Sequence, residues 1–342
     1  MAQFYDMVAD RLSAGQDLEL VLVLQSYGSA PRGAGAVMAV QASGETFGTV
    51  GGGLVEFRAQ KLASDLLRQK SSKLEQVYLG PTEEQGIGMS CGGDVVLYYV
   101  YIPAEAAWAA LFRRLDQAGR SQSQAWLVVS EGLGSLQALE LTEDPDYLAH
   151  LPGAEFQPET DFPRLGRRSL YWQGKQDSFY YVLPLFEKGF VYIFGAGHVA
   201  QALVPVLESC FFPCVVLDNR AEFATRERFP QAYRVLIQDM PGFFEIQPIT
   251  PDDYIIIVTR GHRDDEKVLN RALDTSAGYI GMIGSANKVS AVFTDLIRNH
   301  ERSYAEVRRV HSPIGLPLGG NTPEEIAVSI TAELLQERDR RS

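Results

Sequence analysis

The stretch FVYIFGAGHVA, residues 190–200, joins an apolar run to a short glycine turn. Gly195 permits a tight turn, Gly197 lets the backbone approach a pyrophosphate, and the small Ala200 lets a following helix pack closely against the strand. The N–H groups at the start of that helix would point at the phosphates. The stretch therefore predicts a strand, a phosphate-binding turn with His198 beside the ligand, and a helix.

A second apolar run, residues 214–217, follows the predicted helix and ends at Asp218. Asp218 comes about twenty residues after Gly197, the spacing expected for a carboxylate that binds a ribose hydroxyl at the end of the second strand. Strand, turn, helix, strand and acid occur in the order that such a site requires. The sequence therefore predicts a nucleotide-binding βαβ unit.

The chain after this unit alternates apolar runs with helical segments, as a doubly wound parallel sheet requires. We expect strands at 233–237, 254–258 and 279–283, and helices at 264–273 and 286–299. The C-terminal half is thus predicted to be a Rossmann-like α/β domain. Ligands of such sheets bind outside the carboxyl ends of the strands.

Polar residues follow two of these expected strands. His262 and Asp265 lie three residues apart at a helix start, so both can face one side of that helix. They either form a polar pair near a ligand or cap the helix, and we favour the role at the site. Gly284 and Ser285 end the next strand and are further candidates for ligand binding.

The N-terminal half contains a different glycine cluster, Gly51, Gly52 and Gly53, directly before a predicted helix at 54–67. One interpretation is a tight turn that needs positive φ angles. The other is a nest of N–H donors that holds a phosphate with help from the helix dipole. Arg32, in a preceding loop, either adds a positive charge to the same anion or is only solvated.

Cys91 is followed by Gly92 and Gly93 and precedes an apolar strand at 95–102. A thiolate on an accessible glycine loop can be reached by a ligand and stabilised by neighbouring N–H groups. Cys91 is therefore a candidate reactive or ligand-binding thiol, and the alternative is a small residue in a turn. Cys210 and Cys214 lie in apolar surroundings and are expected to be buried, and the three cysteines form no disulfide framework or paired zinc motif.

The length of 342 residues allows two domains, each with its own core. We expect an N-terminal mixed α/β domain at 1–186 and the Rossmann-like domain at 187–342. The N-terminal domain would include an acidic connection near 131–165, because Glu131 to Asp161 holds eight acidic residues and no lysine or arginine. This connection is predicted to be irregular and solvated, with at most short strands.

The formal net charge of −12 argues against a general nucleic-acid binder, which would usually be basic. Hydrophobic residues make up 46% and charged residues 22%, ordinary values for a folded globular chain. No apolar segment is long enough to span a membrane, and the first residues lack the pattern of a signal peptide. A cytoplasmic protein without membrane contact is expected, and a homodimer is the base expectation for its assembly.

The order of these motifs resembles the xanthine dehydrogenase accessory factor family (XdhC/CoxI). The resemblance begins with GSAPR at 28–32, GTVGGGLVE at 48–56 and CGG at 91–93. It continues in the second domain, where the matching stretches are FGAGHV at 194–199, DNRAEF at 218–223, GHRDD at 261–265, IGMIGS at 280–285 and HSPIGL at 311–316. Most of the chain outside the acidic connection is covered.

The resemblance implies a protein that binds and protects the molybdenum cofactor, as molybdopterin or its dinucleotide form. Such a chaperone presents the molybdenum to a cysteine desulfurase for sulfuration and transfers the cofactor to a molybdenum hydroxylase apoenzyme. Cys91 would lie near the metal or sulfur. The cofactor would be held by Arg32, Gly51, Gly52, Gly53, Gly92, Gly93, Gly195, Gly197, His198, Asp218, Arg220, Gly284 and Ser285.

Two residues depart from the family pattern, and two other functions compete with it. Ala200 replaces the last glycine of the turn, and Leu54 stands where some members have a cysteine, so Cys91 would act without a second thiol. The first competing function is an NAD(P)-dependent oxidoreductase with His262 as general acid or base. The second is a nucleotide-sensing regulator in which Cys91 has no chemical role. Nothing indicates an iron–sulfur or flavin site, so a non-enzymatic maturation factor is favoured over an oxidoreductase.

Overall fold

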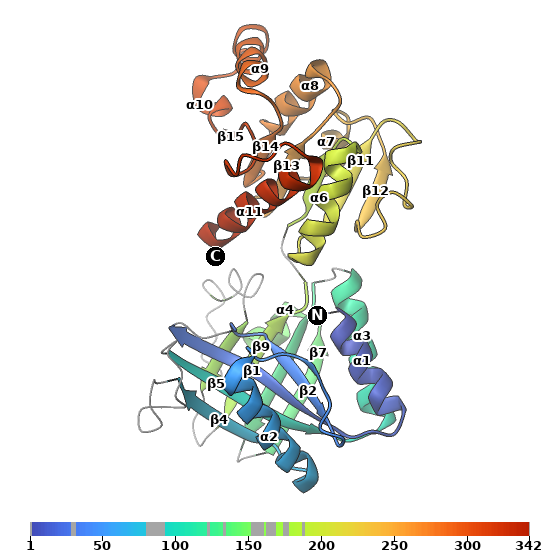
Figure 1. Ribbon diagram of the computed structural model, residues 1–342, viewed down its shortest axis with the longest axis vertical. Helices are drawn as coiled ribbons and strands as arrows, with labels where there is room; N and C mark the ends of the chain where they lie inside the picture. The colour runs from blue at the N-terminus through green and yellow to red at the C-terminus, as the bar shows by residue number, and fades with distance from the viewer. Residues whose placement is uncertain are drawn as a thin grey trace. The chain divides into compact units, whose positions relative to one another are not determined.

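The computed structural model describes residues 2–28, 32–79, 93–121, 124–132, 135–151, 161, 169–173, 178–186 and 189–341 (Figure 1). The chain divides into two compact units, unit 1 at Met1–Phe186 and unit 2 at Glu187–Ser342. Unit 1 has two antiparallel sheets with helices, and unit 2 has a six-stranded parallel sheet. The predicted α/β fold class with a Rossmann-like second half is confirmed.

The first sheet of unit 1 has five antiparallel strands in the order β3-β2-β1-β5-β4. These strands are β1 (Leu18–Gly28), β2 (Val37–Gln41), β3 (Thr46–Gly48), β4 (Lys73–Tyr78) and β5 (Gly93–Ile102). Strand β1 is apolar on both sides, because Leu20 and Leu22 belong to one hydrophobic cluster and Val21 and Val23 to another. This sheet is therefore covered on both faces.

Helices cover the two faces differently. Helices α1 (Ala2–Ser13) and α3 (Ala106–Ser121) pack against each other and contribute Val8 and Phe112 to the cluster that contains Leu20. Helix α2 (Gly53–Gln69) packs its buried residues, Val55 and Ala59 among them, on the face that carries Val21. The apolar run LELVLVL at 18–24 is typical of such a buried strand.

The second sheet of unit 1 has the order β7-β6-β9-β8, with β6 (Trp126–Gly132), β7 (Ser135–Thr142), β8 (Leu170–Gln173) and β9 (Phe179–Pro184). Strand β7 lies in the acidic segment and pairs with β6, and a short helix, α4 (Pro145–Ala149), follows it. The prediction of an irregular connection is therefore wrong for residues 135–142. Leu136, Leu139 and Leu141 contact the hydrophobic core, and this apolar contribution outweighs the charges.

Unit 2 is built on a parallel sheet in the order β12-β11-β10-β13-β14-β15. Its strands are β10 (Val191–Phe194), β11 (Cys214–Asp218), β12 (Arg234–Ile237), β13 (Tyr254–Ile257), β14 (Tyr279–Met282) and β15 (Val310–His311). The chain moves outward from β10 to β12 and then returns to place β13 on the other side of β10. The point between β10 and β13 is the switch point where ligands of such sheets bind.

Helices lie on both faces of this sheet, as a buried parallel sheet requires. Helices α6 (His198–Ser209) and α11 (Pro323–Arg341) lie side by side on one face (Figure 1). Helices α7 (Phe243–Ile246), α8 (His262–Ala272) and α9 (Ala286–Asn299) contribute to the cluster on the other face. Cys214 is buried as predicted, whereas Cys210, expected to be buried, is half-buried after the end of α6.

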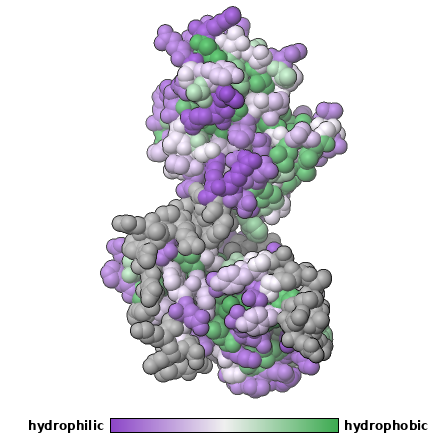
Figure 2. Space-filling model, turned by 90° about the vertical axis from the view of Figure 1, so that its left-hand side faces the viewer, coloured by the Kyte–Doolittle hydropathy of each residue, from purple (hydrophilic) through white to green (hydrophobic). Residues whose placement is uncertain are grey.

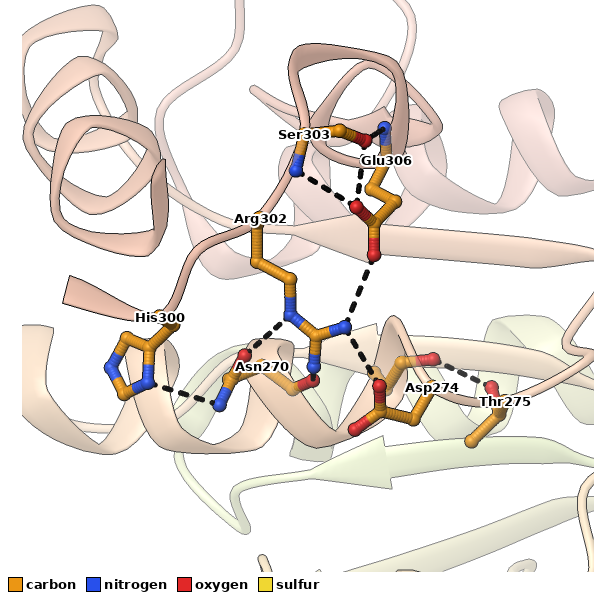
Figure 3. A network of polar contacts seen from close by, with 8 residues as sticks. Asn270, Asp274, Thr275, His300, Arg302, Ser303 and Glu306 are labelled. Carbon is orange, nitrogen blue, oxygen red and sulfur yellow. Dashed lines mark hydrogen bonds and ion pairs between the residues drawn. The ribbon is translucent and has the colours of Figure 1, made fainter. Parts of the chain in front are cut away.

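Arg302 connects α8 to the short helix α10 (Tyr304–Val307), as Figure 3 shows. Its guanidinium donates to Asn270 Oδ1 at 2.7 Å, to Asp274 Oδ1 at 2.7 Å and to Glu306 Oε1 at 3.1 Å. Helices that follow parallel strands run back across the sheet, so α8 ends at the amino edge of the strands. This network therefore stabilises the edge opposite to the predicted ligand site.

The visible surface of unit 2 is mainly hydrophilic with smaller hydrophobic areas between (Figure 2).

Helix α11 begins with Glu324 and Glu325 and ends with Arg338, Arg340 and Arg341. Acidic residues at the start and basic residues at the end of a helix stabilise its dipole. Within the ranges given above, no helix is long and apolar enough to cross a membrane.

Glu19 is a buried carboxyl group on β1 in the core beneath α2. Its side chain is 0% exposed, and neither carboxyl oxygen has a hydrogen-bond partner among the described residues. Burial raises the pKa of Glu19 to about 9, because the charged form loses its hydration. The group is therefore neutral at pH 7, and folding keeps a proton that the unfolded chain would release.

We predict that Glu19→Gln stabilises the protein in a pH-dependent way. The raised pKa means that wild-type stability from this group is complete below about pH 4.5 and is lost as the pH rises towards about 9. At pH 8 the variant should be more stable by on the order of a few kcal/mol, and near pH 4.5 the difference should disappear. Urea unfolding at both pH values measures it, with the exposed Glu45→Gln as control; a pH-independent difference would contradict the prediction.

Candidate functional site

The glycine turn of unit 2 lies at the carboxyl end of β10, beside the switch point of the sheet. Gly195 has a φ of 110°, and a Cβ atom there would lie 2.5 Å from the Val258 carbonyl oxygen. Gly197 is extended, caps α6 without a side-chain hydrogen bond, and has no atom within 4 Å of a built Cβ. Gly195 therefore shapes the fold, whereas Gly197 leaves open space at the helix start, where a phosphate could approach.

Asp218 stabilises this turn from the end of β11. Its side chain is buried, and Oδ2 accepts a hydrogen bond from the Ala196 N–H at 2.8 Å. Arg220 donates its backbone N–H and Nε to Oδ1 at 3.0 and 2.9 Å, and its Nη2 to Oδ2 at 2.8 Å. Burial raises the pKa of Asp218, but the hydrogen bonds from Arg220 and Ala196 outweigh it, and the pKa is lowered. The carboxylate is therefore ionised.

The predicted ribose contact of Asp218 stays a prediction. Each carboxylate oxygen offers two lone pairs, and the four hydrogen bonds described above use all of them. A ribose hydroxyl would bind Asp218 only if Arg220 moved away. In this structure the carboxylate positions the turn and Arg220.

A second polar cluster lies at the carboxyl ends of β13 and β14. Asp265 is 0% exposed and accepts a hydrogen bond from Thr259 Oγ1 at 2.6 Å, and it forms an ion pair with the Lys288 ammonium group. Lys288 also donates to the Ile283 carbonyl at 3.4 Å. Burial raises the pKa of Asp265, although Lys288 and Thr259 favour its charged form. Asp265 was among the predicted site residues, whereas Lys288 was not.

The other predicted residues of this edge have mostly structural contacts. Ser285 caps α9 by accepting the Lys288 N–H at 3.4 Å, and a Cβ at Gly284 would lie 3.3 Å from Lys288 Cδ. His262 begins α8, and its side chain lies outside the described part of the chain. His198 begins α6 next to Gly197. The predicted pairing of His262 with Asp265 therefore stays a prediction.

The HSPIGL stretch, 311–316, contacts α11 through Glu333. The Glu333 carboxylate accepts hydrogen bonds from Tyr279 Oη at 2.9 Å, His311 Nδ1 at 2.7 Å and the Gly315 N–H at 2.5 Å. Burial raises the pKa of Glu333, but these three donors outweigh it, and the pKa is lowered. This stretch is thus fixed to the edge of the sheet by one charged carboxylate.

The sheet topology of unit 1 brings its glycine segments to one end. Gly28, the last residue of β1, pairs with Gly93, the first residue of β5, and Gly48 at the end of β3 pairs with Met38 near the start of β2. The exposed Arg32 and the Gly51–Gly53 turn follow directly from these strand ends. Cys91 and Gly92 lie outside the described residues. Strand β4 ends and strand β5 begins at this same end.

The Gly51–Gly53 turn has the positive φ angles that the sequence suggested, but two of its donors are already used, because the Gly51 N–H donates to the Thr49 hydroxyl and the Gly52 N–H to Glu56. The Glu56 carboxylate oxygen Oε2 accepts hydrogen bonds from the Val50 and Gly52 N–H groups, each at 3.1 Å, and from the Thr49 hydroxyl. Burial raises the pKa of Glu56, but these donors outweigh it, and the pKa is lowered. An internal carboxylate thus occupies the predicted phosphate nest. Because Glu56 is in the first turn of α2, it also caps that helix.

A cavity of about 560 Å³ lies at the opposite end of the same sheet. The α1–β1 turn, the β2–β3 turn and the C-terminal part of α2 line it, and its polar lining residues include Asp17, Gln41, Ser64 and Arg68. The buried Gln41 amide nitrogen has no hydrogen-bond partner within the described chain. No predicted site residue lines this cavity. No three His, Cys, Asp or Glu side chains cluster as metal ligands in the described part of either unit.

Comparisons with known proteins cover both units. Residues 191–334 match the family model described as the XdhC Rossmann domain, and residues 11–78 match that of the XdhC and CoxI family. A Bacillus subtilis (strain 168) protein, named as a probable subunit of xanthine dehydrogenase, is 26% identical over 341 residues, 99% of each chain. The Escherichia coli (strain K12) uncharacterized protein YqeB is 31% identical over 147 residues, which are 42% of this chain and 26% of that protein. A crystal structure of a Bacillus halodurans protein described as a xanthine dehydrogenase has the same fold, with a TM-score of 0.71 at 22% identity over 99% of this chain and 96% of that one.

We predict that Gly195→Ala destabilises the protein and that Gly197→Ala does not. The alanine Cβ at 195 would contact the Val258 carbonyl in a backbone conformation that side chains rarely adopt. This variant should lose at least about 2 kcal/mol of unfolding free energy. The alanine at 197 meets open space and should fold as the wild type does. Urea unfolding of both variants checks this, and equal losses would refute it.

A second prediction concerns the Asp265–Lys288 ion pair. Lys288→Met leaves a fully buried carboxylate without its counter-charge, which should cost about 3 kcal/mol of stability. The double variant Asp265→Asn/Lys288→Met removes both charges and should recover most of that loss. A double-mutant cycle by urea unfolding gives the coupling energy. Additive losses would show that the two side chains do not stabilise each other.

Proposed function

Because the chain belongs to the XdhC and CoxI family, we propose that it is an accessory protein that holds and protects the molybdenum cofactor for a xanthine dehydrogenase-type hydroxylase. The family membership is supported by matches in both units and by the full-length similarity to the Bacillus subtilis protein. The proposed role includes presenting the cofactor for sulfuration by a cysteine desulfurase and transferring it to the hydroxylase apoenzyme. A homodimer is the proposed assembly.

The observation that carries this proposal is the open space at the glycine turn of unit 2. Gly197 has free space above it at the start of α6, and the turn is fixed by the Asp218 carboxylate. The first N–H groups of a helix have no partner within that helix and attract anions. A cofactor that carries phosphate, as molybdopterin and its dinucleotide both do, suits this edge through its phosphates.

Unit 1 supports the proposal through the convergence of its glycine segments. Arg32, the Gly51–Gly53 turn and Gly93 all adjoin strand ends on one side of the sheet. A ligand phosphate could use the donors of the Gly51–Gly53 turn by replacing the Glu56 carboxylate. Cys91 enters the same proposal from the sequence as a thiol for the molybdenum or its sulfur. When bound, the cofactor would supply the oxidation–reduction chemistry of the hydroxylase, while this chain would bind and protect it.

An NAD(P)-dependent oxidoreductase is the second candidate function, because the parallel sheet and glycine turn suit a dinucleotide. Asp218 argues against simple NAD binding, since its lone pairs are all used by Ala196 and Arg220. Catalysis by His262 would require its imidazole to lie next to the substrate. The accessory function is therefore the better supported of the two.

The proposed function predicts that the protein carries pterin when it is purified from a host that makes the molybdenum cofactor. Acid extraction with oxidation would release a fluorescent pterin, and we expect it in amounts comparable to the protein. Cys91→Ala should lower this amount or reduce activation of the hydroxylase while the fold stays intact. Cys210→Ala, which removes a thiol from unit 2, is the control and should behave as the wild type.

Two results would contradict this proposal. Pterin at the level of an unrelated protein, together with hydride transfer to NAD(P), would favour the oxidoreductase. Unchanged pterin content and unchanged hydroxylase activation in Cys91→Ala would remove the role of the thiol. Circular dichroism and urea unfolding of each variant separate a binding effect from a folding effect.

A further inference from the structure

We propose that Arg220 and Arg228 form a binding site for a phosphomonoester beside the glycine turn of unit 2. The site would make this unit select a ligand with a terminal phosphate over the same ligand without it. The inference deepens the proposed function and rests on it in one respect, namely that unit 2 binds an organic phosphate. It does not depend on whether that phosphate belongs to a nucleotide or to a pterin.

Arg228 is anchored at the start of α6 and has donors to spare. Its Nη2 donates to the Ala196 carbonyl at 3.3 Å and to the Gln201 side chain at 2.9 Å, so the guanidinium lies against the glycine turn. Its Nε is buried and has no hydrogen-bond partner in the described structure. A buried donor without a partner is costly, and it indicates an acceptor that belongs there.

Arg220 provides the second guanidinium. It donates Nε and Nη2 to the two oxygens of Asp218, which leaves Nη1 without a partner among the residues that the structure describes. Asp218 neutralises Arg220 but is itself only 1% exposed, so it does not present a repelling charge to a ligand. Arg228 has no acidic partner in the described part of unit 2. Asp218, Arg220 and Arg228 together therefore carry a net charge of +1, and Glu222 and Asp264 are further acidic neighbours of Arg220.

Phe223 holds the two guanidinium groups in place. The Arg220 guanidinium carbon lies 3.9 Å from the centre of the Phe223 ring, and that of Arg228 lies 4.7 Å from it. Phe223 itself packs against the hydrophobic cluster beneath α6. Cation–π contacts of this kind fix the planes of flexible arginine side chains before a ligand arrives. The arginine side chains are then already ordered in the folded protein, so binding a ligand loses little of their conformational entropy.

The chemistry of these donors fits a phosphomonoester. Guanidinium groups bind phosphate oxygens through paired, planar N–H donors, and the α6 N-terminus adds an anion-attracting dipole. A terminal phosphate has a higher charge per phosphorus atom and more free oxygens on that atom than the diester or pyrophosphate that the glycine turn alone would take. An arginine after the second strand is also where Rossmann folds accommodate a ribose 2′-phosphate. The terminal phosphate of molybdopterin offers the same chemistry without a ribose.

The test compares ligands that differ by one phosphate. Calorimetric titration of the full chain at constant low ionic strength would use NADP+ against NAD+, which lacks the 2′-phosphate and has no other terminal phosphate. A second arm would use the fluorescent oxidised pterin of the cofactor with its phosphate intact or removed by phosphatase. We expect at least a tenfold preference for the extra phosphate in one arm.

The variants are chosen to separate binding from folding. Arg228→Gln removes the charge and should abolish the preference, and Arg228→Lys keeps the charge without the planar fork and should retain part of it. Arg226→Gln is the matched control, because Arg226 lies on the same segment but donates to the Ala232 carbonyl and should keep the full preference. Urea unfolding of each variant confirms that it is folded.

Each outcome decides the proposal. A preference only in the nucleotide arm assigns the site to a ribose phosphate, and one only in the pterin arm assigns it to the cofactor's own phosphate. No phosphate preference in either arm, or a preference that survives in Arg228→Gln, overturns the inference. Loss of pterin binding with an intact nucleotide preference would instead reject the proposed cofactor function and leave this site standing.

Discussion

The hydrogen bond from the Ala196 N–H to the Asp218 carboxylate is the contact on which the binding edge of unit 2 depends. It joins the turn after β10 to the end of β11, while Gly195 packs against the Val258 carbonyl at the end of β13. One buried charge therefore joins two adjacent strand ends, and the close packing of Gly195 adds the third. Arg220 compensates that charge, so the carboxylate can stay ionised away from water.

The parts of this edge that the sequence predicted are those set by local chemistry. Gly195, Gly197 and Asp218 are recognisable because a turn, a close approach and a strand end each demand a particular residue at a particular spacing. The ion pair between Asp265 and Lys288 could not be predicted in the same way. It joins the first turns of α8 and α9, which only the packed sheet brings together.

Unit 1 shows a different limit of sequence reasoning. The glycine run allowed either a tight turn or a nest of N–H donors for a phosphate, and in the structure the carboxylate of the nearby Glu56 accepts a hydrogen bond from the Gly52 N–H. In β7 the abundance of acidic residues suggested a loop. Leu136, Leu139 and Leu141 are three and two residues apart, which is not the regular alternation of a strand, because the pairing with β6 has an irregularity opposite Ser130 and Glu131. Their contacts with the core show that burial of apolar side chains decides the pairing more than surface charge does.

Because the Glu56 carboxylate lies at the Gly51–Gly53 turn, a free anion can bind there only by replacing that carboxylate. The carboxylate is tethered four residues from Gly52, so its local concentration at the donors is on the order of millimolar or higher, and a free anion must displace it. The apparent affinity for a free anion is then the difference between the binding free energy of that anion and that of the Glu56 carboxylate at the same donors. Weakly held inorganic ions are rejected, and a guest with further points of attachment elsewhere can still enter. The displaced carboxylate would return as soon as that guest leaves, which resets the empty turn without any outside help.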